Sequence, residues 1–290
     1  MNISALIVAY NSDIELLKNN ISNLLEQVSS VVICNNGEND LQVLSSEKVV
    51  VFDFEDNLGI AKAQSIGMKF SFDNGADFVV QLDDDSIIKK NFITDLIYRF
   101  NKLKSNGIPV GLIAPKHFDK IDGDVDEKRL PQGLYLQEFK VTEVHAVISS
   151  CSIIPRTTYE SVGGMDDDLF IDYVDWEYCW RVQHNGLKVF RVEDLLLPHR
   201  VGAGVVSIAG NLDARIPSPI RHYYHSRNTI VLSFRNYSPK AIMLKEILKL
   251  PVKVLCYPFI FSDGFIRTKY ILRGIWDGLC QRKGKLRLRD

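Results

Sequence analysis

The first hundred residues alternate between two hydrophobic patterns. Short apolar runs rich in branched residues are typical of buried strands, and apolar residues three and four positions apart are typical of helices that cover them. Ser12 with Glu15 three residues later predicts a capping box at the start of the first helix. The predicted strands are 3–10, 31–34, 49–54 and 78–82, and the predicted helices are 14–28, 60–70 and 91–104. This alternation predicts an α/β fold whose mostly parallel sheet is flanked by helices.

The rest of the chain has a less regular pattern. The prediction is for strands at 110–114, 147–154 and 188–192, a long polar loop at 117–145, and a helix around 173–184. From Pro219 onward the pattern is helical. We expect interruptions at Pro239, Pro251 and Pro258, because proline removes a helical hydrogen bond. The chain thus divides into three regions, 1–104, 105–218 and 219–290.

Composition places the chain among ordinary globular proteins. Of its 290 residues, 46% are hydrophobic and 24% are charged, which allows a buried core and argues against a disordered or fibrous class. No apolar run reaches the length of about 18 residues that a membrane-spanning helix needs. No basic segment precedes the first strand, so we expect no signal peptide. The five cysteines lack metal-ligand spacing, which favours a reducing compartment.

Charge is distributed unevenly along the chain. Residues 239–290 contain twelve Lys or Arg against four Asp or Glu, so their net charge is +8 and that of residues 1–238 is −9. The acidic body argues against nucleic-acid binding, and the basic tail predicts contact with something anionic. Over 241–280 this charge is interspersed with large apolar side chains. That mixture fits a membrane interface with anionic lipids, or a helix pair that packs on the main domain.

Polar clusters follow three of the predicted strands. They are Tyr10-Asn11-Ser12, Asn35-Asn36-Gly37 and Asp83-Asp84-Asp85. Because parallel sheets bind their ligands at the carboxyl ends of the strands, these clusters predict a binding site. Carboxylates placed there can hold a hard divalent cation, which in turn bridges phosphate oxygens. The alternative for the three aspartates is a solvated turn or a helix N-cap.

A second acidic cluster contains Asp172, Asp175 and Glu177. A carboxylate that faces the carboxyl edge of the sheet can act as a general base. The alternatives are a helix start whose acidic residues complement the helix dipole, and an ion pair between Glu177 and Arg181 four residues later.

Two further residues have candidate roles. The neutral imidazole of His199 is a competent metal ligand, although a single histidine is more often a packed or surface residue. Arg227 lies in a predicted helix where its guanidinium could meet a diphosphate, beside aromatic residues that are more typical of a core.

Taken in order, these segments resemble the inverting family 2 glycosyltransferases, and most of all the bacterial dTDP-rhamnosyltransferases of O-antigen and polysaccharide assembly. The resemblance extends over nearly the whole chain. The matching segments are IVAYNS, NNG, NLGIAKAQSIG, QLDDDS, ISSCSII, GGMDDDLFIDYVDWEYCWR, HRVG, RHYYHSRNTI and RGIWDGLCQRKGK.

The resemblance implies a GT-A fold, which is a Rossmann-like, mostly parallel sheet flanked by helices, here with a C-terminal helical extension. Region 1–104 would bind the nucleotide-diphosphate-sugar donor, 105–218 the acceptor, and 219–290 would be a basic helical region that associates with a membrane. A Mg²⁺ or Mn²⁺ ion would be held by Asp83 and Asp85, with His199 completing the site. Asp175 would be the catalytic base.

The resemblance also implies the remaining contacts. The donor-binding positions are Ala9, Tyr10, Asn11, Asn36, Asn57, Gly59, Asp83, Asp84 and Arg227. Positions near the acceptor or behind the base are Glu177, Arg181, Ser150 and Cys151.

Three departures from the family pattern affect these expectations, and one of them is Gln64 in place of a frequent asparagine. The second predicted strand ends in Asn35-Asn36, where many relatives have an aspartate that reads the pyrimidine. An amide can still hydrogen-bond the base, but the preference for one base is less certain. Cys151 stands where relatives commonly have glycine after the paired serines.

The implied reaction is an inverting single displacement. It transfers L-rhamnose from dTDP-L-rhamnose to a hydroxyl of a growing, lipid-linked cell-surface glycan, at the inner face of the bacterial plasma membrane. A UDP-hexose or UDP-N-acetylhexosamine donor is the alternative within the family. A sugar-phosphate nucleotidyltransferase would need a Gly-rich activating loop that IVAYNSDIE does not provide, and a non-catalytic nucleotide-sugar-binding module would not need both acidic clusters. The acceptor, the linkage and a homo-oligomeric state stay open.

Overall fold

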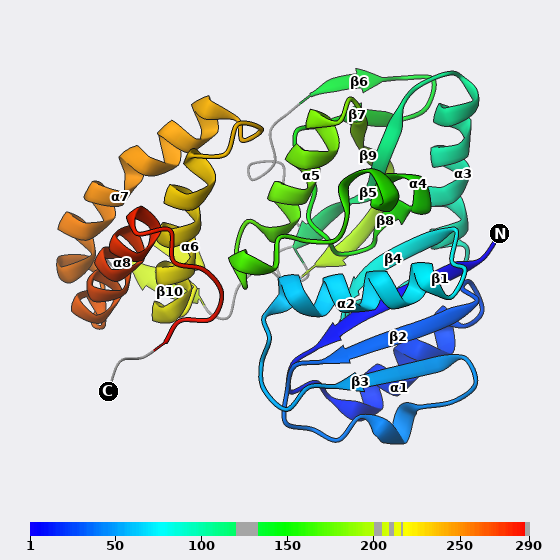
Figure 1. Cartoon of the computed structure of the whole chain (residues 1–290), viewed down its shortest axis with the longest axis horizontal. Coiled ribbons are helices and arrows are strands. Elements are labelled where there is room, and N and C mark those ends of the chain that lie inside the picture. The colour runs from blue at the N-terminus through cyan, green and yellow to red at the C-terminus, as the bar shows by residue number, and fades with distance from the viewer. Residues whose placement is uncertain (120–132, 200–204, 209–211, 216, 288–290) are drawn as a thin grey trace.

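The computed structural model describes residues 1–119, 133–199, 205–208, 212–215 and 217–287, without the side chains of Asp119, His199 and residues 205–215. Nine of the described strands form one sheet in the order β3-β2-β1-β4-β8-β5-β9-β7-β6 (Figure 1). Their bounds are β1 Ile3–Ala9, β2 Ser30–Asn35, β3 Val49–Asp53, β4 Phe78–Asp83, β5 Val110–Asp119, β6 Leu134–Leu136, β7 Val141–Glu143, β8 Ser152–Pro155 and β9 Lys188–His199. A separate hairpin pairs β10 (Val205–Ile208) with β11 (Leu212–Arg215).

The first four strands are parallel, as the alternating pattern predicts. Strand β8 is antiparallel to both β4 and β5, whereas β9 runs parallel to β5. The sheet therefore continues across the predicted boundary at residue 104. The carboxyl ends of β1, β2 and β4 lie side by side at one edge, which brings the three polar clusters together.

Helices cover both faces of the sheet, because successive strand residues point to opposite sides. On one face α1 (Ile14–Leu24) and α3 (Phe92–Ser105) pack on residues such as Ile7 and Ile33. On the other face α2 (Ile60–Asp73) and α5 (Val174–His184) pack on residues such as Leu6 and Val32. The short α4 (Arg156–Val162) follows β8, and short 3₁₀ turns span Gln42–Leu44 and Asp167–Leu169.

Three helices form the C-terminal region, and Figure 1 shows them gathered beside the sheet. They are α6 (Pro219–Ser233), α7 (Lys240–Ile260) and α8 (Gly264–Leu279). Helix α8 approaches α6 closely: a Cβ on Gly274 would lie 2.4 Å from the carbonyl oxygen of Tyr223, and one on Gly278 would lie 2.7 Å from Cβ of Ile230. Within the described ranges, no helix has the length and apolar character needed to cross a membrane.

Several local predictions were wrong, each because a tertiary contact overrides a local signal. Asp13, rather than Ser12, caps α1 by accepting the backbone N–H of Leu16, since the Ser12 hydroxyl donates to Asp84 instead. Pro239 precedes α7 as predicted, but Pro251 and Pro258 lie inside that helix. Burial of α7 residues such as Met243 and Leu250 against its neighbours offsets the hydrogen bonds that the two prolines remove.

Two other boundaries differ from the prediction. The segment 147–154 becomes a strand only at Ser152, because a turn at 149–151 precedes it. Within the predicted loop 117–145, β5 extends to Asp119 and the short β6 and β7 form, while residues 120–132 lie outside the described part.

Candidate active site

The aspartate triplet begins at the last residue of β4. Asp83 lies opposite Val8 of β1, and the Ser86 N–H donates to the Asp83 carbonyl, which turns the chain so that Asp83 and Asp85 are both half-buried at the sheet edge. Asp84 is directed to the loop after β1, where it accepts the Ser12 hydroxyl and, at 3.4 Å, the Tyr10 N–H. Burial raises the pKa of Asp84, despite these two hydrogen bonds. Its observed partners hold the loop between β1 and α1.

The loops after β1, β2 and β3 are tied together by amide side chains. The Asn36 backbone N–H donates to Ala9 O at 2.8 Å. The Asn36 side chain donates to Gly59 O at 3.2 Å and accepts from Leu58 N at 3.1 Å. The Asn11 side chain accepts from the N–H of residue 38 at 3.0 Å. The structure therefore brings most of the predicted donor-binding positions to one edge, with Tyr10 exposed above them.

Gly59 joins this edge to a second loop. Its φ is +83°, and a Cβ there would lie only 2.5 Å from the ring of Phe170. The Asn57 side chain accepts the Gly59 N–H at 2.8 Å, and Ala61 N donates to the Phe170 carbonyl at 3.3 Å. Only glycine satisfies both the left-handed backbone and the close approach. The predicted donor loop is thus packed against the segment that leads into α5.

The turn at 149–151 lies between the aspartate triplet and α5. Cys151 is buried with φ +57°, and its N–H donates to Gln81 O at 2.6 Å. This left-handed conformation explains why glycine suits the position. Burial, and secondarily the charge of Asp83, raises the pKa of the Cys151 thiol. The Ser150 carbonyl contacts His117 Nε2 at 2.8 Å, and its hydroxyl lies 3.3 Å from that of Ser86.

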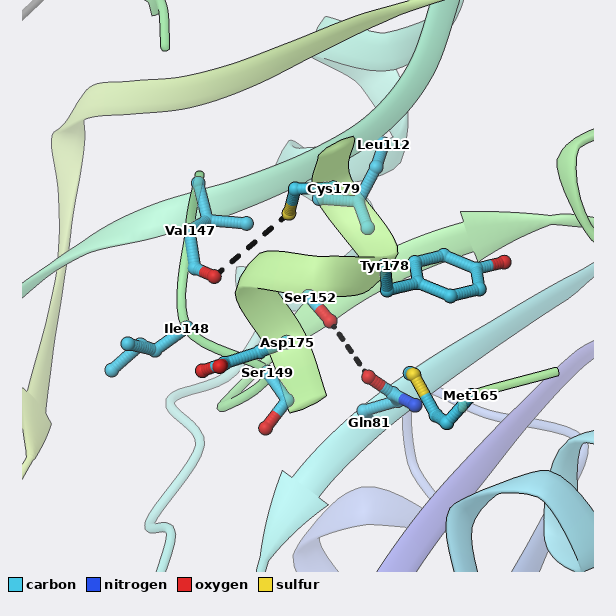
Figure 2. A pocket seen from close by; sticks show the side chains of 10 residues that line it. All are labelled: Gln81, Leu112, Val147, Ile148, Ser149, Ser152, Met165, Asp175, Tyr178 and Cys179. Atoms are coloured by element: carbon cyan, nitrogen blue, oxygen red, sulfur yellow. Dashed lines mark hydrogen bonds between the residues drawn. The ribbon is translucent and has the colours of Figure 1, made fainter. Parts of the chain in front are cut away.

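Asp175, the second residue of α5, lies on the other side of this turn. Figure 2 shows its carboxylate beside Ile148 and Ser149, at the mouth of a small pocket. Burial raises the pKa of Asp175 to about 6, although hydrogen bonds from the backbone of Trp176 and Ser149 oppose the shift. A carboxylate with such a pKa is ionised at neutral pH and still accepts a proton readily. This combination suits a general base.

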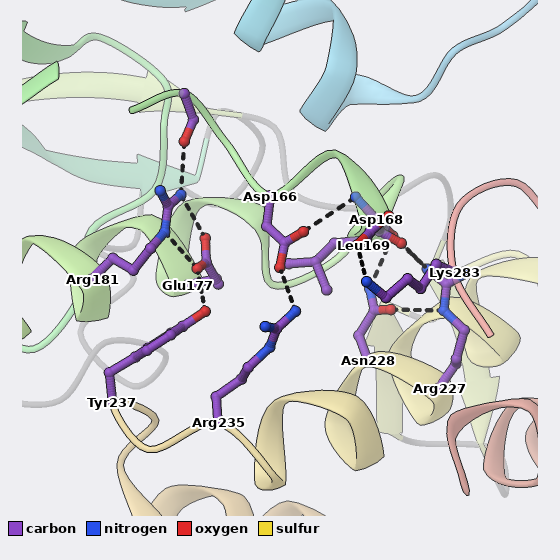
Figure 3. Close-up of polar contacts among 11 residues, drawn as sticks. Asp166, Asp168, Leu169, Glu177, Arg181, Arg227, Asn228, Arg235, Tyr237 and Lys283 are labelled. Atoms are coloured by element: carbon purple, nitrogen blue, oxygen red, sulfur yellow. Dashed lines mark hydrogen bonds and ion pairs between the residues drawn. The ribbon is translucent and has the colours of Figure 1, made fainter. Parts of the chain in front are cut away.

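Glu177 and Arg181 form an ion pair, which was the alternative to a role in the chemistry for these two residues. Glu177 is fully buried, and Arg181 binds it through two nitrogens at 2.6 and 2.9 Å (Figure 3). The Tyr237 hydroxyl also donates to Glu177 at 2.7 Å, and Arg181 donates to two carbonyls near Gly163. These contacts fasten α5 to the segments before and after it.

Arg227 has different partners from the expected diphosphate. Its side chain is 1% exposed, and its guanidinium donates to the carbonyls of Asp168, Leu169 and Gly284 (Figure 3). It thus links α6, the Asp167–Leu169 turn and the segment after α8. Sequence spacing did not reveal this role, because the partners lie 57 to 59 residues away.

The donor set at the end of β4 fits a hard divalent cation. Asp83 and Asp85 supply carboxylate oxygens, which Mg²⁺ and Mn²⁺ prefer, and diphosphate oxygens and water are the usual further ligands. Among the described residues, no cluster of three His, Cys, Asp or Glu side chains could hold a metal by itself. His199 ends β9 opposite Asp119, and its side chain lies outside the described residues.

Comparison with known proteins defines the class. Residues 4–163, more than half of the chain, match the model of glycosyl transferase family 2, and the chain belongs to that family. It is 34% identical over 253 residues to the dTDP-rhamnosyl transferase RfbF of Shigella flexneri, covering 85% of each chain. It is 24% identical over 201 residues to the low-salt glycan biosynthesis hexosyltransferase Agl10 of Haloferax volcanii, covering 65% of this chain and 64% of that one.

Solved structures share the fold at low sequence identity. The 1–349 fragment of S. aureus TarS superimposes with a TM-score of 0.58 at 14% identity, covering 96% of this chain and 81% of that one. GalNAc-T7, solved with UDP, GalNAc and Mn²⁺, gives a TM-score of 0.55 at 15% identity, over 85% of this chain and 53% of its own. The mostly parallel sheet with flanking helices and C-terminal helices is thus the GT-A fold that the sequence predicted.

Proposed function

We propose that the protein transfers L-rhamnose from dTDP-L-rhamnose to a hydroxyl of a growing, lipid-linked cell-surface glycan, with inversion at the anomeric carbon. The observation that carries the proposal is the position of Asp175, whose pKa is raised to about 6, across the 149–151 turn from the carboxylates of Asp83 and Asp85. The identity to RfbF supports the choice of donor.

In this mechanism the sheet edge binds the donor and α5 supplies the base. Tyr10, Asn11 and the loop around Gly59 would hold the nucleotide, remote from the reacting carbon, so that binding energy orients the sugar. Asp83 and Asp85 would hold Mg²⁺ or Mn²⁺, which neutralises charge on the leaving diphosphate. Asp175 would accept the proton of the acceptor hydroxyl as that oxygen attacks from the face opposite the diphosphate.

The test is calorimetric binding of dTDP-L-rhamnose, UDP-glucose, UDP-galactose and UDP-N-acetylglucosamine, each with and without Mg²⁺. Metal-dependent binding of dTDP-L-rhamnose, lost in Asp83→Asn, is the expected result. Tight binding of a UDP sugar instead would overturn the proposed donor and keep the family.

Transfer from a UDP-hexose or UDP-N-acetylhexosamine is the second candidate. Asn35 stands where many relatives have an aspartate that reads the pyrimidine, and its side chain donates to Asp53 and to the Asn39 carbonyl, so it selects neither thymine nor uracil and a UDP donor fits this edge as well. The TarS structure with UDP-GlcNAc has the same fold, but at 15% identity it supports the fold alone.

The C-terminal helices support a location at the inner face of the bacterial plasma membrane. One face of α7 exposes a row of large apolar side chains at steps of three and four residues: Leu244, Leu248, Val252, Leu255 and Phe259. Helix α8 adds a second such row: Phe265, Leu272, Trp276 and Leu279. Exposed Lys245, Lys249 and Lys269 lie on the same two helices. Apolar rows accompanied by lysines fit the interface of an anionic bilayer.

A further inference from the structure

The loop that carries the proposed base into the site has an unusual backbone. Phe170, Asp172 and Tyr173 have φ of +64°, +69° and +66°, and none of them is glycine. Such a backbone conformation is unfavourable for residues other than glycine, and it persists only where surrounding contacts hold it. Asp175 follows two residues after Tyr173. The position of the base therefore depends on whatever holds residues 170–173.

Helix α6 supplies those contacts. The Asn228 side chain donates to the carbonyls of Leu169, Ile171 and Asp172 at 3.1, 2.8 and 2.9 Å. The Tyr224 ring stacks on Phe170, with centroids 4.8 Å apart and planes 15° from parallel. Asn228 and Tyr224 both lie on helix α6, so one rigid element holds several consecutive residues of the loop.

Arg221, one turn before Tyr224, forms an ion pair with Asp172, three residues before the base. Its guanidinium binds the Asp172 carboxylate with two hydrogen bonds, the one from Nε being 2.9 Å long. Asp172 is 16% exposed and Arg221 is 40% exposed, so the pair lies at the edge of the site and is only partly screened.

The pair also sets part of the electrostatic field at Asp175. Among the groups that interact electrostatically with that carboxylate are Asp172 from the preceding loop, Arg221 from α6, and the Cys179 thiol from the next turn of α5. The 147–151 segment contributes the backbone of Ser149, which hydrogen-bonds this carboxylate. Without the guanidinium, the charge of Asp172 would act on Asp175 uncompensated.

We propose that Arg221 is a positioning residue for the base, which holds Asp172, and through it the 170–173 loop, and cancels the negative charge of Asp172 beside Asp175. The proposal rests on Asp175 being the base, as in the proposed function. It predicts that Arg221 changes the proton affinity of Asp175 as well as the activity. A purely structural arginine would change only the activity.

The experiment titrates Asp175 directly, by the ¹³C shift of its carboxyl carbon in labelled protein, assigned by its loss in Asp175→Asn. In Arg221→Gln we expect the pKa of Asp175 to rise by about 0.5–1 unit, because a compensating cation is removed. The double change Arg221→Gln with Asp172→Asn should return the pKa of Asp175 close to its original value. Arg221→Lys keeps a cation at this position, so it should shift that pKa much less than Arg221→Gln does. An unchanged titration in Arg221→Gln, or no return in the double variant, would overturn the inference.

The same variants separate this inference from the proposed function. The rate of dTDP release from dTDP-L-rhamnose, with water as acceptor, falls at acid pH as the base becomes protonated. In Arg221→Gln this fall should occur at a higher pH. If Asp175→Asn still turns over, the base assignment fails whatever the titration shows. If Asp175→Asn is inactive and the titration in Arg221→Gln is unmoved, only the role of Arg221 fails. Where Arg221→Gln does not fold, Asp172→Asn alone must lower the pKa of Asp175, because it leaves the Arg221 cation uncompensated, and an unchanged pKa would overturn the inference.

Discussion

Helices α1 and α7 differ in the polarity of the surface that they expose. In α1 the buried residues are Leu17, Asn20, Ile21 and Leu24, and the exposed positions are mostly polar. In α7 only Met243 and Leu250 are buried, while a row of leucine, valine and phenylalanine side chains is exposed. Water solvates the first surface well and the second poorly. Helix α1 therefore presents a mostly polar surface, whereas α7 exposes a row of apolar side chains.

The two regions meet at the 166–173 loop. The α/β domain supplies the sheet edge and α5, and α6 holds the loop between them through Arg227, Asn228 and Tyr224. This arrangement predicts that chemistry and surface binding can be lost separately, and that damage to the α6–α8 contact harms both.

The largest effect should come from Asp175→Asn. The amide cannot accept the acceptor proton, so we expect turnover to fall by at least about 10³-fold, within the usual range for a general base. Donor affinity and vesicle binding should stay unchanged, because neither depends on this carboxylate. Release of dTDP under steady-state conditions measures the loss. Asp73→Asn, which removes an exposed carboxylate of α2, is the matched control. Near-normal turnover in Asp175→Asn would refute the base assignment.

Gly274→Ala should damage both regions at once. The new Cβ would lie 2.4 Å from Tyr223 O, so α8 must move away from α6. We expect the free energy of unfolding to fall by about 1–3 kcal/mol, the usual cost of overpacking. Turnover should fall as well, since α6 holds the loop before the base.

Urea unfolding and donor turnover are the measurements for this change. Leu272→Ala, at a 51% exposed position of the same helix, should alter stability by less than about 0.5 kcal/mol. Equal stability of Gly274→Ala and the original protein would mean that α8 can move away from α6 at little cost in free energy.

More of the α/β domain than of the C-terminal region and its contacts could be predicted from the sequence. The apolar runs of β1 to β4 place Tyr10, Asn36 and Asp83 at one edge, because the alternation of strands and helices predicts parallel strands whose carboxyl ends share an edge. The role of Arg227 could not be predicted, because it depends on carbonyls of residues that are distant in the sequence. The strained loop before Asp175 was missed for a similar reason: no residue of FIDYV signals a left-handed backbone, which is held by contacts from α6 and from the Gly59 loop.

The apolar row on α7 gives the sharpest test of the comparison itself. Leu248→Glu with Leu255→Glu places two carboxylates on the row, where they lose apolar burial in a bilayer and are repelled by anionic lipids. We expect binding to phosphatidylglycerol–phosphatidylcholine vesicles to weaken at least about tenfold, while release of dTDP in solution stays unchanged. Vesicle sedimentation measures the first quantity.

Leu16→Glu is the control for this pair, because Leu16 is an exposed leucine of α1 (38%) and should leave vesicle binding unaffected. Equal binding of all three proteins would show that the row does not contact lipid. A double variant that changes oligomeric state instead, by sedimentation velocity, would identify a second copy of the chain as its partner.

The smallest effect concerns stability against pH, and it separates the base from the rest of the fold. Because burial raises the pKa of Asp175 to about 6, the folded state binds the proton more tightly than the unfolded chain, whose pKa is near 3.8. Stability contributed by the protonated carboxyl is therefore complete below about pH 4 and is lost as the pH rises towards 6. A shift of two units corresponds to at most about 3 kcal/mol, and the half-buried position should reduce this to about 1–2 kcal/mol. Asp175→Asn should raise the Tm at pH 7 and leave it nearly unchanged at pH 4, measured by calorimetry with Asp73→Asn beside it. If the two variants gave the same Tm difference at both pH values, the carboxyl of Asp175 would not be buried at a cost, and its suitability as a base would have to come from the acceptor complex.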